Sequence, residues 1–257
     1  MATTATSPGR RSATVVIWAT LLAVAALCWA WLLTWSAGSA MSMDTAMGMS
    51  GAPPTLAAFL GVWVVMMAAM MLPSVAPVSR TYLRVLRTST PRGAAPLRVV
   101  GLVAGYLLAW AAYGLVAFAL TRRLDALATT SDRARVWAAA VALAVAGAYQ
   151  FTPLKATCLQ HCRSPLSVLL HVGSFTGPLR DVRVGVWHGG YCLGCCWSLM
   201  LVLVAVGVMN MVWMAALTVV IFLEKVWRHG RPLSRAVGVG LLVLAVLLPW
   251  QGSVLGL

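Results

Sequence analysis

Five of the six cysteines in this chain fall in one part of the sequence, between residues 158 and 196. Cys158 and Cys162 are four residues apart, a spacing that places both thiols on one face of a helical turn. The other three fall within the stretch GGYCLGCCWSLM at 189–200. Thiolate sulfur is a ligand that soft metals prefer, so this cluster predicts a metal site for Cu(I), with zinc as the second candidate.

Other side chains with metal-binding atoms extend this cluster. His161 lies between the first two cysteines, and His188 precedes the second group by four residues, on the same helix face. In membrane helices rising about 1.5 Å per residue, Met70, Met71 and Glu224 would reach the depth of the thiols, roughly 20 Å below the outer surface. Glu224 would support the ligands or accept the protons that thiols release on binding metal. The candidate ligands are Cys158, Cys162, Cys192, Cys195, Cys196, His161, His188, Met70, Met71 and Glu224.

Each of these residues also has an ordinary structural interpretation. Cysteine packs in cores as a small hydrophobic side chain, and methionine fills irregular gaps. Glu224 stands beside Lys225 near the expected inner end of a helix, where both side chains can extend to the interface. Packing is the expected role of Cys28 in the first apolar segment, whereas five cysteines within 39 residues favour a shared metal.

The elements that must position these side chains are long apolar segments. The chain of 257 residues is 61% hydrophobic and 9% charged, whereas soluble proteins carry about 25% charged residues. A helix needs about 20 apolar residues to cross a hydrocarbon core of about 30 Å. The composition therefore predicts an all-α bundle of about seven transmembrane helices in a single integral membrane domain. The predicted spans are residues 13–35, 55–77, 99–120, 136–154, 184–208, 211–227 and 236–251.

The net charge of +14 follows the predicted spans rather than forming one patch. With the N-terminus inside, 15 of the 19 basic residues fall in inner segments and only four fall outside. This asymmetry follows the positive-inside rule, and with seven spans it places the C-terminus outside. The pattern indicates the lipid bilayer as a partner and argues against nucleic acid.

Two segments at the expected outer surface leave alternatives open. Gly38-Ser39-Ala40 resembles a signal-peptide cleavage site, but the preceding apolar stretch is longer than a signal peptide needs, so we expect a retained first span. Methionines recur in MSMDTAMGM at 41–49, in a segment rich in small residues. Such thioethers suit a transient Cu(I) site outside the membrane, and an ordinary linker is the equal alternative.

Four stretches of this sequence resemble a bacterial family of predicted metal-binding membrane proteins, named domain of unknown function 2182. They are MMAAMMLPSVAP, KATCLQHCRSP, GGYCLGCCWSLM and GVMNMVWMAALTVVIFLEK, and the resemblance covers residues 55–227. Some members of that family carry a copper chaperone label. The resemblance implies a location in the bacterial inner membrane and a metal-binding role for the same cysteines, Glu224 and the methionine-rich second span.

The leading hypothesis is a membrane protein that binds copper and delivers it to a copper-dependent protein or a metallochaperone, without being an enzyme. A thiol–disulfide oxidoreductase is the second hypothesis, with Cys192 and Cys195 exchanging with Cys158 and Cys162. All five cysteines fall on the expected inner, reducing side, which disfavours persistent disulfides. A metal permease, with a path along the helix face of His188, is the third. The chain has no GxxxxGKS/T nucleotide-binding motif, and its five acidic residues are too scattered for carboxylate catalysis.

Overall fold

The computed structural model describes residues 8–38, 55–89, 95–128, 132–164, 175, 177–206 and 210–250. Every regular element in these residues is an α-helix, which confirms the all-α prediction. The helices are α1 (Pro8–Gly38), α3 (Leu56–Ser89), α4 (Ala95–Ala128), α5 (Asp132–Tyr149), α6 (Pro153–Arg163), α8 (Arg180–Val206), α9 (Met211–Val226) and α10 (Gly230–Leu247). The predicted methionine segment at 41–49 lies outside the described residues.

Five of the described helices contain segments long and apolar enough to cross a membrane. The segments are Val15–Trp35, Leu56–Ser79, Leu97–Ala126, Arg180–Val206 and Gly230–Leu247. Helices α5 and α6 qualify as a sixth span only as a bent pair. Helix α9 has 16 residues, so it would rise about 24 Å in a hydrocarbon core of about 30 Å. Each predicted segment is thus helical over most of its length, but length and composition support five or six spans in the described chain rather than seven.

The single helix predicted over residues 136–154 is wrong at its C-terminal end. Helix α5 ends at Tyr149, and α6 begins at Pro153 with a change of direction of 68°. Thr152 caps the new helix, because its side-chain oxygen accepts a hydrogen bond from the Lys155 backbone N at 3.3 Å. Pro153 has no N–H to bond back into α5, whereas the first turn of a new helix accommodates it. After the bend, α6 and its two cysteines lie against α8 and α9.

The outer faces of these helices are apolar. Leu27 on α1, Leu97 on α4 and Val212 on α9 are 69%, 73% and 78% exposed. Lys155 and Glu224, in contrast, are buried. A water-soluble protein rarely exposes extended apolar surface, whereas a lipid-facing surface consists of it. This distribution is typical of a membrane protein.

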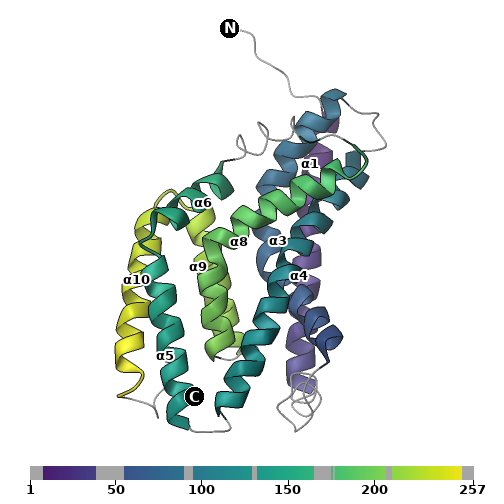
Figure 1. The fold of residues 1–257 in the computed structure, drawn as a ribbon. Coiled ribbons are helices and arrows are strands. Elements are labelled where there is room, and N and C mark those ends of the chain that lie inside the picture. The colour runs from purple at the N-terminus through teal and green to yellow at the C-terminus, as the bar shows by residue number, and fades with distance from the viewer. Residues whose placement is uncertain are drawn as a thin grey trace.

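Helix α8 crosses the bundle obliquely (Figure 1). Helices α5 and α10 lie side by side on one flank, and α1, α3 and α4 form the other. Helices α4 and α8 pack closely because both carry glycine at the contact. A Cβ atom at Gly105 would lie 2.1 Å from the Val182 backbone oxygen, and one at Gly185 would lie 2.1 Å from the Leu102 oxygen. Larger residues would force the helices apart, so the two glycines fix how near α8 lies to α4.

Asp181 ties the beginning of α8 to two other helices. It accepts a hydrogen bond from the Tyr82 hydroxyl of α3, and its other carboxylate oxygen lies 3.9 Å from Arg98 Nε of α4. Burial and the adjacent carboxylate raise the pKa of Tyr82, so its hydroxyl stays a neutral donor at physiological pH. These contacts hold the beginning of the helix that carries three of the cysteines.

Candidate metal site

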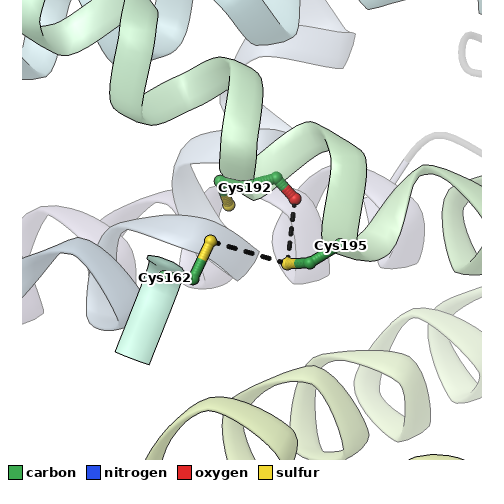
Figure 2. Close-up of side chains that lie close together, drawn as sticks. All are labelled: Cys162, Cys192 and Cys195. Atoms are coloured by element: carbon green, nitrogen blue, oxygen red, sulfur yellow. Dashed lines mark hydrogen bonds between the residues drawn. The ribbon is translucent and has the colours of Figure 1, made fainter. Parts of the chain in front are cut away.

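Three of the predicted thiols meet in the interior of the protein (Figure 2). The Sγ atoms of Cys162, Cys192 and Cys195 all lie within 4.8 Å of one another. Cys162 belongs to α6 and the other two belong to α8, and the Sγ atoms of Cys162 and Cys195 are 3.7 Å apart. Cys192 and Cys195 are each 1% exposed. The group is therefore a set of soft ligand atoms at the contact between two helices, with Cys162 half-buried and the other two almost fully buried.

The helix geometry of α8 sets the positions of its three thiols. Cys192 and Cys195 are three residues apart, so both side chains lie on one face. The thiols of Cys195 and Cys196 donate hydrogen bonds to the Cys192 carbonyl oxygen, at 3.1 Å and 2.8 Å. Cys196 is fully buried but does not join the three-thiol group. The pair that faces α6 is therefore Cys192 and Cys195, and not the adjacent pair Cys195 and Cys196.

Helix α6 approaches α8 closely because residue 194 has no side chain. A Cβ atom at Gly194 would lie 2.8 Å from the Cys158 sulfur. The Tyr149 hydroxyl of α5 donates a hydrogen bond to the Gly194 carbonyl oxygen, which holds the bend near the same place. Cys158 therefore fills the contact between the helices, and Cys162, one turn later, contributes its sulfur to the group.

Cys192 has two polar neighbours from other helices. Lys225 Nζ of α9 donates to Cys192 Sγ at 2.9 Å, and the Tyr106 hydroxyl of α4 lies 3.0 Å from the same sulfur. Both side chains are buried. A cation and a hydroxyl at these distances stabilise negative charge on sulfur, and the thiolate is the form that binds a metal.

Of the two predicted methionine ligands, Met71 lies near this group. Met70 and Met71 of α3 are 2% and 0% exposed. Met71 Sδ lies 3.9 Å from Lys225 Nζ, which in turn contacts Cys192. The sulfur of Met71, from a third helix, thus lies near the lysine that contacts Cys192.

The predicted histidine ligands lie outside the three-thiol group. The His161 ring stacks on Tyr191, with 4.4 Å between the ring centroids, and its Nδ1 lies 3.0 Å from the Thr157 carbonyl oxygen. The His188 ring is buried and stacks on Tyr106 at 6.0 Å. Both histidines line the region around the thiols without contributing a ligand atom to the group in this conformation.

Glu224, another predicted ligand, faces a cation rather than the thiols. Its carboxylate oxygens lie 2.9 Å and 3.1 Å from Lys155 Nζ of α6. Lys155 also donates to the side-chain oxygen of Gln150, which accepts a second hydrogen bond from Ser234 at 2.9 Å. Glu224 and Lys155 are 2% and 1% exposed, so they form a buried ion pair that joins α9 to α6.

Two residues at the site, Lys225 and Tyr106, are absent from the set predicted from the sequence. Lys225 is expected at the interface from its place near the end of a predicted span. The sequence did offer a signal for Lys225, because it directly follows the predicted ligand Glu224. Tyr106 gave no such signal, because no predicted ligand lies on its helix.

The apolar helices and the group of thiols between them define the class of this chain: a helical protein of the membrane type with a candidate soft-metal site. Residues 60–248 match the family model PpoB2, described as copper chaperone. The match covers more than half of the chain, and the protein therefore belongs to this copper chaperone family. The match supports the copper chaperone label that some members of the resembled family carry. It does not support the particular family name, domain of unknown function 2182. No curated protein and no solved structure matches the chain.

Proposed function

We propose that this protein binds Cu(I) through Cys162, Cys192 and Cys195 and passes the ion to a copper-dependent protein or a metallochaperone. The observation that carries the proposal is the meeting of three sulfur atoms from two helices within 4.8 Å. The family to which the chain belongs supports copper as the metal. The apolar helices support a location in a membrane, and we propose the bacterial inner membrane.

The spacing of the sulfur atoms suits a single soft ion. A metal–thiolate bond of about 2.3 Å, the value for zinc, places three thiolates around one ion about 4 Å apart. The Cys162–Cys195 distance of 3.7 Å is close to that value. Structural zinc sites take four ligands, but in the described part of the chain the group contains three. A set of three sulfur atoms therefore favours Cu(I) over a closed structural zinc site.

Delivery to a partner requires one ligand that the partner can reach. Cys162 is half-buried, whereas Cys192 and Cys195 are almost fully buried. Cys162 is also the next-to-last residue of α6, a helix of 11 residues. A thiol of the receiving protein would reach this ligand first, so we expect transfer to begin with replacement of the Cys162 sulfur.

Copper analysis of protein purified without oxygen in detergent tests the proposal. After loading with Cu(I) and removal of the excess, we expect about one copper ion per chain, because the three thiolates together retain a single ion. The double variant Cys162→Ser/Cys195→Ser should lose this copper. Cys28→Ser is the matched control, because Cys28 lies on α1, and it should keep the ion. Full copper retention by the double variant would contradict the proposal.

The short distance between Cys162 and Cys195 also favours a second candidate, thiol–disulfide exchange. This pairing differs from the exchange expected from the sequence, because one sulfur comes from each helix. Oxidation of the pair would remove two of the three proposed copper ligands, so the two functions exclude each other in one molecule. A redox titration of the purified protein separates the two functions. A two-electron couple in the range of cellular thiol buffers supports exchange, whereas the absence of such a couple supports metal binding.

A further inference from the structure

The ammonium group of Lys225 lies between a thiol of α8 and a thioether of α3. Its Nζ atom is 2.9 Å from Cys192 Sγ, 3.1 Å from Ser74 Oγ and 3.9 Å from Met71 Sδ. Lys225 is 8% exposed, and Cys192 and Met71 are 1% and 0% exposed. A monovalent cation thus already occupies a buried position with soft ligand atoms beside it.

The choice of lysine at this position is specific. Of the 19 basic residues only Lys155 and Lys225 are lysines, and both are buried. Lys155 pairs with a carboxylate, whereas Lys225 contacts a thiol, a hydroxyl and a thioether. An ammonium group is a compact single charge, as Cu(I) is, while the guanidinium group of arginine is broad and planar. Lys225 therefore resembles the proposed cargo in charge and in the atoms that surround it.

We propose that the position of Lys225 Nζ is a first binding position for Cu(I), between Cys192 and Met71, which the lysine occupies while no metal is bound. This inference rests on the proposed function and adds a site beside the three thiols. The arriving ion takes Cys192 Sγ and Met71 Sδ as ligands, and the ammonium group leaves. Because Cys192 belongs to both sites, the ion then reaches Cys162 and Cys195 without releasing the Cys192 sulfur.

The lysine has a route out of the interior. Helix α9 ends at Val226, one residue later, and the charged side chain of Arg228, just beyond this end, is exposed. From such a helix end, a four-carbon side chain can extend its charge to the polar boundary. One positive charge replaces another, so the net charge among the packed helices is unchanged. This exchange avoids leaving a buried charge without compensation, which would be costly.

Amine acylation of the unmodified full-length protein tests the displacement. Purified protein in detergent is treated briefly with an amine-acylating reagent, with and without equimolar Ag(I), a redox-stable probe for Cu(I). Mass spectrometry then quantifies the modification at each of the two lysines. We expect Ag(I) to raise the acylation rate of Lys225 at least about tenfold, because the amine moves to the polar boundary, while Lys155 stays protected. Unchanged acylation of Lys225 in protein with bound Ag(I) overturns the inference.

Met71→Leu tests the thioether ligand, and Met70→Leu is its matched control. The two methionines are adjacent on α3 and similarly buried, but their side chains point about 100° apart around the helix axis. We expect Met71→Leu to lower the Ag(I) affinity about tenfold and Met70→Leu to change it less than about twofold. Equal effects of the two substitutions would remove Met71 from the site.

The double variant Cys162→Ser/Cys195→Ser separates this inference from the proposed function. It removes two of the three thiols but retains Cys192 and Met71, so Ag(I) at higher concentration should still expose Lys225 to acylation. If wild-type protein holds silver through the thiols while Lys225 stays protected, the inference fails and the proposed function stands. If the double variant holds as much silver as the wild type, with the same affinity, the proposed function fails.

Discussion

At the scale of single residues, Cys192 depends on side chains from two other helices for its chemistry. The Tyr106 hydroxyl of α4 and the Lys225 ammonium group of α9 approach its sulfur at 3.0 Å and 2.9 Å. The thiolate would carry an uncompensated charge among apolar helices without such partners. The reactive form of this cysteine is therefore a property of three helices together.

Tyr106→Phe should weaken soft-metal binding while leaving the fold intact. The substitution removes one hydroxyl that contacts Cys192 Sγ and leaves the packed ring in place. We expect the Ag(I) affinity, measured by equilibrium competition, to fall about tenfold, as is common for residues that orient a metal ligand. Tyr113→Phe is the control, because that hydroxyl donates to the Trp197 carbonyl oxygen instead. Equal affinities of the two variants would show that the Cys192 contact has no influence on binding.

The sequence predicted that thiols from two segments would meet, but it did not predict which side chains would surround them. The spacing of cysteines along α6 and α8 indicates which thiols share a helix face, and these faces meet in the structure. It does not indicate which other helices face them, because that depends on packing between distant segments. For this reason Glu224 was expected at the metal and Lys225 at the interface, whereas Glu224 pairs with Lys155 and Lys225 contacts Cys192.

At the scale of elements, the contact between α6 and α8 determines whether the three thiols meet. Gly194→Ala should disturb it, because the added Cβ atom would lie 2.8 Å from the Cys158 sulfur. We expect a loss of about 1–3 kcal/mol of stability, typical of overpacking, and weaker metal binding as α6 shifts outward. Thermal unfolding in detergent and copper stoichiometry measure the two effects.

Gly190→Ala is the matched control for that substitution. It adds the same methyl group one helical turn earlier on α8, where no neighbouring atom lies within 4 Å of the new Cβ atom. Alanine also favours a helix over glycine by about 1 kcal/mol, so this variant should be at least as stable as the wild type. If both variants bind copper as the wild type does, close packing at residue 194 is not required for the site.

The length of the apolar segments predicted the helices, but it did not predict the joint between α5 and α6. Hydropathy alone extends the fourth predicted span to residue 154, past the true end of α5 at Tyr149. The stop is local: Thr152 caps a new helix and Pro153 cannot bond to the previous one. These two residues indicated a helix beginning, but only the folded structure gives the bend of 68°.

At the scale of the whole molecule, the distribution of arginine predicts the orientation of the bundle in the membrane. Single cysteines introduced by Thr130→Cys and Thr90→Cys test it, at positions expected outside and inside respectively. In intact cells, a membrane-impermeant maleimide should label residue 130, and it should label residue 90 only after lysis. The parent protein provides the background from its native thiols. Labelling of residue 90 in intact cells would reverse the expected orientation.

Glu224 and Lys225 are adjacent in the chain, yet they serve different neighbours, Lys155 on α6 and Cys192 on α8. The order of these two residues therefore decides which buried partner each side chain meets, and composition, hydropathy and net charge do not record that order. Transposing them would leave all three quantities unchanged, but it would set ammonium against ammonium and carboxylate against sulfur. A chain with lysine at position 224 and glutamate at position 225 would need different buried partners for both side chains, however similar the rest of its helices are.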